Sequence, residues 1–245
     1  MSAEGVAERR GLGEHLGRTF RALHLRDFRL FWLGQVVSNT GTWMQSIAQA
    51  WLVLRLTDSP LALGTVTMLQ ALPVLMFGLF GGVIADRFPK RKLLLFTQLM
   101  MCLQALALGI LTYTDLIQLW QVYVLALSLG LLNALDNPTR QTLVSELVPP
   151  DDLPNAVSLN SLSFNTSRLI GPAAGGLTIA VVGVAGCFLL NALSFVGVVT
   201  SLLMIRTRPS AHAARAARGR SPPPTPALSR HPRRSPPGRP QTPPG

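Results

Sequence analysis

Charged residues are scarce in this chain. Only 13% of its 245 residues are Asp, Glu, Lys or Arg, while 48% are hydrophobic. A soluble domain of ordinary composition carries about 25% charged residues. The shortage therefore excludes an ordinary soluble domain and favours a protein that lies in a membrane.

Cysteine and histidine are also scarce, and they form no cluster in the sequence. The two cysteines lack the spacing of a disulfide framework or a metal site, and the four histidines lie outside the apolar runs. A membrane-embedded enzyme would need paired carboxylates, a Ser/His arrangement or metal ligands. We therefore predict no enzyme activity, no catalytic residue, no cofactor and no metal. The residues concerned are Cys102, Cys187, His15, His24, His212 and His231.

Acidic residues are missing from the last forty positions. Residues 206–245 hold nine arginines, eleven prolines and no Asp or Glu, whereas the rest of the chain has 13 basic and 11 acidic residues. The net charge of +11 therefore comes mainly from this tail and does not indicate nucleic-acid binding. Its composition predicts disorder. The tail is either a basic arm that touches anionic lipid head groups or an out-of-frame translation of a GC-rich gene.

Long apolar runs are what the sequence does have. A helix needs about 20 apolar residues to cross a bilayer. Six segments qualify and predict an all-α integral membrane protein with six transmembrane helices. The expected division is a cytoplasmic segment over 1–28, a transmembrane unit over 29–206 and a tail over 207–245. The spans are roughly 30–54, 61–85, 93–113, 119–139, 156–180 and 184–205.

The basic residues beside these spans predict the orientation. Eleven of them lie before the first span, in the loop between the second and third, or at the end of the fourth, and only Arg55 lies on the opposite side. Basic residues favour the cytoplasmic face. We therefore expect a multi-pass protein of the cytoplasmic membrane with both termini inside. The eleven are Arg9, Arg10, Arg18, Arg21, Arg26, Arg29, Arg87, Lys90, Arg91, Lys92 and Arg140.

Polar residues follow one face of the first span, and others recur in the fifth. Such a stripe favours a water-filled cavity, although polar residues also bind helices to one another. Trp43 lies at the edge of the stripe, where it would contact an apolar substrate or simply pack. Arg168 is expected to be buried in the fifth span, as a functional residue or in an ion pair. The predicted pathway residues are Gln35, Ser38, Asn39, Thr42, Trp43, Gln45, Gln49, Asn165 and Arg168.

The fourth span carries a polar cluster near its end. Asp136 and Arg140 are four residues apart, close enough to pair on a helix. Pairing of Asp136 with Arg168 would require a bend, for which Pro138 gives a reason. Spans three and six have few polar residues, so we expect spans one, four and five to line a pathway and the other two to pack outside. The cluster consists of Asn133, Asp136, Asn137 and Arg140.

Two motifs resemble those of the major facilitator superfamily. "GGVIADRFPKRK" (81–92) is similar to the signature of its second-to-third loop, and "SRLIGPAAGG" (167–176) is similar to the fifth-helix motif of its antiporter branch, with Ser167 in place of the first glycine. The matching loop residues are Gly82, Asp86, Arg87, Lys90 and Arg91. The matching fifth-helix residues are Gly171, Pro172, Gly175 and Gly176.

Three further stretches narrow the resemblance. "FWLGQVVSNTGTWMQ", "NALDNPTRQ" and "LVPPDDLPNAVSLNS" look like the enterobactin-exporter-like, or transmembrane secretion effector, branch. The resemblance implies one six-helix half, built as a 3+3 inverted repeat, of a twelve-helix transporter. It also implies that Asp86 latches the two halves together, with Arg87 and Arg91 as local partners.

The implied function is proton-coupled efflux of small amphipathic molecules that resemble drugs or siderophores. The expected partners are the lipid bilayer, a small-molecule substrate, and a second transporter half or a second copy of the chain, with no nucleic acid. Because only six spans are found, we expect a truncated N-terminal half. The rival interpretation is a non-transporting fragment or a membrane scaffold half.

Overall fold

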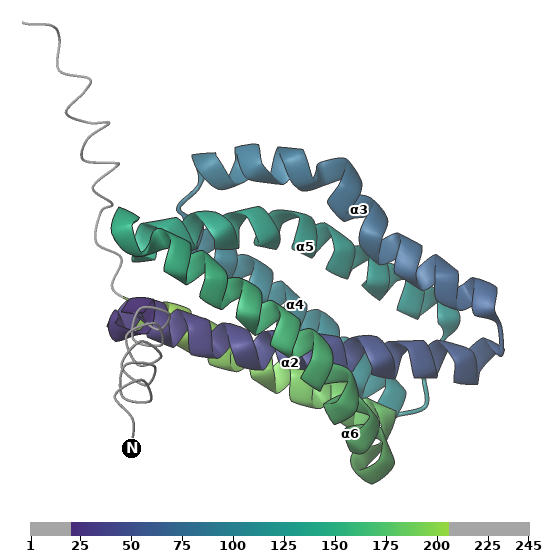
Figure 1. Ribbon diagram of the computed structural model, residues 1–245. Coiled ribbons are helices and arrows are strands. Elements are labelled where there is room, and N and C mark those ends of the chain that lie inside the picture. The colour runs from purple at the N-terminus through teal and green to yellow at the C-terminus, as the bar shows by residue number, and fades with distance from the viewer. Residues whose placement is uncertain (1–20, 206–245) are drawn as a thin grey trace, which may run out of the picture. The chain divides into compact units, whose positions relative to one another are not determined.

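A computed structural model describes residues 21–205, and all its regular elements are helices (Figure 1). The expected tail 207–245 and most of the segment 1–28 lie outside the described residues. The elements are η1 (Arg21–His24), α2 (Arg26–Thr57), α3 (Pro60–Arg87), α4 (Lys90–Tyr113), α5 (Leu119–Leu147), η2 (Pro150–Asp152) and α6 (Leu153–Met204).

Local sequence explains where several helices end. Asp58 adopts a left-handed conformation after α2, and its N–H bonds to the carbonyl of Leu54 at 2.8 Å. Helix α6 contains a break at Gly183, whose φ of 82° and ψ of 175° form a region that only glycine adopts readily. The break divides α6 into a first part, 153–182, and a second part, 184–204. Helix α5 does not end near 139 as expected but continues through Pro138 to Leu147.

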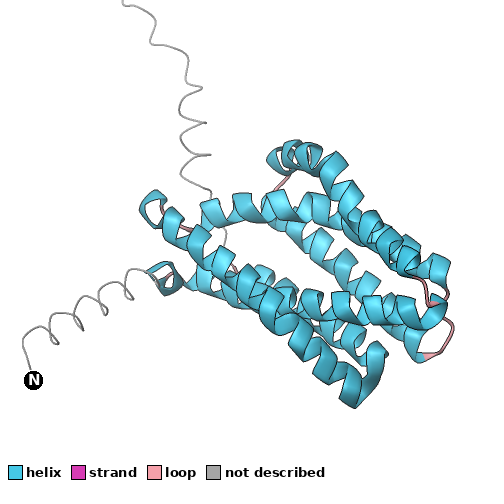
Figure 2. Cartoon of the chain, turned by 45° about the vertical axis from the view of Figure 1, so that its right-hand side comes forward, coloured by secondary structure: helices cyan, strands magenta, loops and turns pink. Residues whose placement is uncertain are grey.

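The helices pack in pairs that small residues bring together. Helix α2 runs beside α6 and α3 beside α5, while α4 contacts both α5 and α6 (Figures 1 and 2). A Cβ atom added at Gly130 of α5 would lie 2.6 Å from the carbonyl oxygen of Gln70 in α3, and one at Gly109 of α4 would lie 2.7 Å from Leu189 of α6. Glycine therefore permits these close approaches.

One end of the bundle is fastened by polar contacts between different elements. We call it the basic end; it comprises residues 21–29, 87–94, 140–156 and 198–205. Arg21 pairs with Asp152 at 3.2 Å and Lys90 with Glu146 at 4.0 Å. The N–H of Ala22 donates to the side chain of Asn155 at 3.0 Å. A cluster of buried apolar residues that includes Phe28, Leu94 and Leu202 packs beneath these contacts.

The opposite end is held differently. It comprises the turns at 58–59, 114–118 and 182–183, and the polar bonds recorded at these turns are local. Gln118 and Gln121 bond each other's backbone at the start of α5, and Trp120 Nε1 donates to Gln118 Oε1 at 2.7 Å. The contacts between helices at this end are apolar, in a cluster that includes Leu52, Leu108 and Phe188.

Four helical segments of the described chain are long and apolar enough to cross a membrane: Pro60–Gly78, Lys90–Tyr113, Leu119–Leu147 and Pro150–Met204. Helix α2 does not reach this level of hydropathy because its polar stripe lowers it. Large apolar side chains lie on the outer surface; Leu61 is 81% exposed and Leu75 is 79% exposed. Each of the six expected spans overlaps α2 to α5 or one part of α6, and the six crossings remain a prediction.

Candidate functional site

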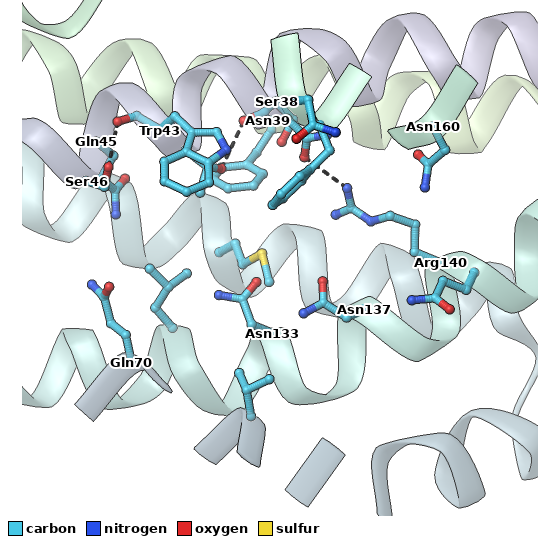
Figure 3. Close-up of a pocket in the computed structure, with 18 of the residues that line it drawn as sticks. Ser38, Asn39, Trp43, Gln45, Ser46, Gln70, Asn133, Asn137, Arg140 and Asn160 are labelled. Atoms are coloured by element: carbon cyan, nitrogen blue, oxygen red, sulfur yellow. Dashed lines mark hydrogen bonds between the residues drawn. The ribbon is translucent and has the colours of Figure 1, made fainter. Parts of the chain in front are cut away.

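A polar cavity lies between α2, α5 and the first part of α6, with α3 at one side (Figure 3). It encloses about 620 Å³. Nine carboxamides, four hydroxyls and one arginine line it, together with six apolar side chains. The polar lining residues are Ser38, Asn39, Thr42, Gln45, Ser46, Gln49, Gln70, Asn133, Asn137, Arg140, Gln141, Asn160, Ser161 and Asn165, and the apolar ones are Trp43, Val74, Met101, Leu129, Phe164 and Phe195.

The polar stripe of α2 supplies much of this lining. Figure 3 shows Ser38, Asn39, Trp43, Gln45 and Ser46 projecting from α2 toward α5 and α3. All the α2 residues expected from the sequence line the cavity except one, Gln35. That side chain is fully buried, and neither atom of its amide has a hydrogen-bond partner in the described part of the chain.

Asp136 and Arg140 form the ion pair that their spacing predicts. Asp136 is completely buried; its Oδ1 accepts hydrogen bonds from Thr97 Oγ1 at 2.6 Å and Gln98 Nε2 at 2.8 Å. Its Oδ2 accepts from Nε of Arg140 at 3.1 Å and also from Nη2. Nη1 of Arg140 donates to Asn39 Oδ1 at 3.2 Å and so connects α5 with α2. Both carboxylate oxygens are therefore occupied by donors.

Arg168 differs from the expectation of a buried residue. Its side chain is exposed, it does not pair with Asp136, and it is not among the residues that line the cavity, although the sequence predicted it there. The reason is the way α6 packs on α2: Ser163, Ser167, Gly171 and Gly175 are the buried residues, spaced by four, and Arg168 lies beside this stripe. The Arg168 guanidinium lies 5.5 Å from the ring centre of Trp43, which lines the cavity.

An aromatic pair continues this contact. The rings of Trp43 and Phe164 meet edge to face, with centres 5.8 Å apart and an interplanar angle of 69°. Asn165, which the sequence also predicts as a pathway residue, lines the cavity beside Phe164. The cation, the indole and the phenyl ring thus form one group at the edge of the cavity.

A buried hydrogen-bond network, which the sequence analysis did not predict, lies behind the cavity. Gln45 Nε2 donates to Gln104 Oε1 at 3.2 Å, and Asn191 Nδ2 donates to Gln45 Oε1 at 2.7 Å. Ser194 Oγ then donates to Asn191 Oδ1 at 3.0 Å. Gln104 of α4 and Asn191 of the second part of α6 are therefore buried and bond Gln45 of α2 across the helix contacts. The available signal was the small number of polar residues in these apolar spans, among them Gln98 and Gln104 in one and Asn191 and Ser194 in the other.

Comparison with known families identifies the protein family of this chain. The family model of the transmembrane secretion effectors matches residues 18–220. The chain belongs to this family of major facilitator transporters. The match begins within the expected N-terminal segment 1–28 and ends beyond the expected boundary at 206. With its apolar helices, this transporter-family chain is a multi-pass protein of the cell membrane.

Curated relatives of this family chain are transporters by name. It is 32% identical to the uncharacterized MFS-type transporter YfiS of Bacillus subtilis, over 66% of this chain and 38% of the relative. It is 32% identical to the staphyloferrin A transporter of Staphylococcus aureus (63% and 39% covered) and 29% identical to the multidrug efflux pump Tap of Mycolicibacterium fortuitum (60% and 37% covered). The chain thus spans less than two-fifths of these relatives.

The fifth-helix motif holds α6 against α2 in this chain. A Cβ atom at Gly171 would meet Trp43 Cβ and lie 2.9 Å from the carbonyl oxygen of Thr40, and one at Gly175 would lie 3.2 Å from the carbonyl oxygen of Met44. Gly176 faces away, with nothing within 4 Å. Pro172 lies within α6, partly exposed.

Ser167, which replaces a glycine of the family motif, adds polar contacts at the same interface. Its Oγ donates to the carbonyl oxygen of Val36 at 3.3 Å and accepts from Thr40 Oγ1 at 3.1 Å. The hydroxyl therefore ties the helices at a point where glycine would only let them approach.

The loop motif joins the ends of three helices. Lys90 pairs with Glu146 of α5, and Arg91 donates through Nε to the carbonyl oxygen of Leu202 at 2.7 Å. Gly82 lies in α3 with open space beside it, and Arg87 is exposed. Asp86 lies in α3, but its side chain is outside the described part, so the proposed latch stays a prediction.

Proposed function

We propose that this chain forms the N-terminal six-helix half of a secondary active exporter of small amphipathic molecules. The observation that carries the proposal is the 620 Å³ cavity, whose lining mixes amides with aromatic and aliphatic side chains. Such a mixture suits a ligand with an apolar body and several polar groups. The names of two relatives, a multidrug efflux pump and a staphyloferrin A transporter, support drug-like or siderophore-like substrates.

Six crossings and a 3+3 inverted repeat are part of this proposal. The break at Gly183 supports it, because it divides α6 into two parts of about membrane-spanning length. The basic residues at one end of the bundle support an orientation in which that end, and both termini, face the cytoplasm.

The proposed drive is proton-coupled antiport, and family membership supports it. Asp136 is the carboxylate nearest the cavity among the described residues, through its contact with the lining residue Arg140. Asp86 is proposed as the latch that joins this half to a second one. That second half, or a second copy of the chain, would cover the cavity.

The rival function is a scaffold half that transports nothing. Binding distinguishes the two, using the full chain in lipid nanodiscs and three fluorescent probes: dansyl-phenylalanine, its methyl ester, and its ester with choline. An exporter half is expected to bind at least one probe. Replacing the cavity amide in Asn133→Leu should weaken that binding about tenfold because hydrogen bonds are lost. The matched control is Thr200→Val, since Thr200 is exposed on α6 and bonds only its own helix, and binding should not change.

Transport is then measured in proteoliposomes that carry a pH gradient. Movement of a bound probe above the level of protein-free liposomes supports the exporter. Binding of none of the probes, or binding without any movement by the chain alone or with a second half, overturns it in favour of the scaffold.

A further inference from the structure

The charge of the cavity is unusual for a site that accepts organic cations. Of the twenty lining residues only Arg140 is ionised, and no carboxylate is among them. Asp136 compensates Arg140 but is completely buried, and its two oxygens already accept from Thr97, Gln98 and Arg140. A cationic ligand would therefore lose its hydration without gaining a carboxylate partner, which is costly.

Arg168 adds a positive charge that has no such compensation. None of the ion pairs recorded for residues 21–205 includes it. Its guanidinium lies over the face of Trp43, so the face that could have received a ligand cation already holds one. No hydrogen bond from the guanidinium to a described residue is recorded, so its N–H groups are free to bind a carboxylate through two parallel hydrogen bonds.

The neighbours of Arg168 supply the rest of a subsite. Trp43 and Phe164 present an aromatic surface next to the guanidinium. Asn165, one turn before Arg168 on α6, and Asn39, one turn before Trp43 on α2, belong to the nine carboxamides of the cavity. Amide N–H groups donate to the oxygens of hydroxyl, carbonyl and carboxylate groups.

We propose that the exported substrate is an amphipath with a carboxylate, which Arg168 binds while Trp43 and Phe164 contact the apolar part and the carboxamides bind its remaining oxygens. The proposal rests on the proposed function and deepens it by naming the substrate class. Arg168 is thereby a specificity-determining residue for anionic over cationic ligands, and its stacking on Trp43 keeps the guanidinium in place.

The three dansyl-phenylalanine probes test this directly in nanodiscs that hold the full chain. They share one apolar body and differ in one group, which is a carboxylate, a neutral methyl ester or a quaternary ammonium. The carboxylate probe is expected to bind about tenfold more tightly than the ester, as one charge-assisted contact allows, and the choline ester most weakly.

Arg168→Gln should remove this preference. We expect about a tenfold loss of affinity for the carboxylate probe and an unchanged affinity for the methyl ester. The unchanged ester also shows that Trp43 keeps its position. Arg168→Lys keeps the charge but not the two-point geometry, so an intermediate affinity is expected. Arg55→Gln removes an exposed positive charge about 18 Å farther along α2 than Trp43 and should change nothing.

These experiments distinguish failure of the carboxylate subsite from failure of the proposed exporter function. Tighter binding of the choline ester than of the carboxylate, or equal losses for carboxylate and ester in Arg168→Gln, overturns the carboxylate subsite and leaves the exporter standing. Failure of all three probes to bind overturns both.

Discussion

Helix α2 has two polar sides that do different things. Toward α6 its neighbours are small, and contact is direct: Gly171 lies against Thr40 and Trp43, and Ser167 bonds Val36 and Thr40. Toward α5 the helices stand apart around a cavity, and the bond between Arg140 and Asn39 bridges them. Small residues allow the first interface and large polar ones maintain the second, so polarity alone does not tell lining from packing.

Gln45 combines the two roles, because it both lines the cavity and bonds neighbouring helices. Its amide is fully used by Gln104 and Asn191, yet the residue also lines the cavity. Asn133, by contrast, lines the cavity and has no recorded hydrogen bond to a described residue. An amide with partners on both atoms stabilises the bundle, whereas one without them is free to bind a ligand.

The largest expected effect comes from breaking the ion pair in α5 that holds Arg140, the residue that bridges to α2. Asp136→Asn leaves the charge of Arg140 without its buried partner, and removing one member of such a pair costs about 3–5 kcal/mol of unfolding free energy. Unfolding of the purified chain in detergent, followed by tryptophan fluorescence, measures this. The double variant Asp136→Asn with Arg140→Gln carries no unpaired charge and should be more stable than the single one. A double variant no more stable than Asp136→Asn would mean that the pair is not coupled.

A smaller effect is expected at the direct interface. Gly171→Ala places a methyl group against Trp43 and the Thr40 carbonyl, and overpacking of this kind costs about 1–3 kcal/mol. Gly176→Ala is the matched control, because its methyl group meets nothing within 4 Å. Alanine there should leave the unfolding free energy unchanged or raise it by up to about 1 kcal/mol, since alanine favours helix. Equal losses in both variants would contradict the assignment of Gly171 to the α2–α6 contact.

The smallest effect separates the two kinds of amide. Asn191→Leu removes the donor to Gln45 and should cost about 1 kcal/mol of unfolding free energy, a usual value for such bonds in membranes. Asn133→Leu should change stability by less than about 0.5 kcal/mol and act on ligand affinity instead. Measuring both quantities on both variants tests the distinction; it fails if Asn133→Leu is the more destabilising of the two.

The sequence was a good guide to features that depend on neighbours along one helix. The α2 stripe predicted six of the lining residues, and the spacing of Asp136 and Arg140 predicted their bond. It was a poor guide where the partner comes from elsewhere in the chain. Gln45 and Asn191 are 146 positions apart, and nothing local indicates that they meet.

The exposure of Arg168 could not be predicted from local sequence either. Depth along a helix is read from residue number, but exposure depends on which face the neighbouring helix covers. Because Ser167 and Gly171 turn toward α2, Arg168 lies outside that contact. Helix α5 likewise runs past the expected span of 119–139 to Leu147, and Leu143 and Val144 beyond that span are buried in the core.

The uneven fastening of the two ends has a mechanical consequence. Arg21, Lys90 and Arg91 join separate elements by polar contacts at one end, whereas the helices at the far turns meet through apolar contacts. The basic end is thus the fixed end of the bundle, about which the helices can pivot. A small rotation of the helices about the basic end produces its largest displacement at the far turns. A force on the helices therefore changes the distances between them most at those turns.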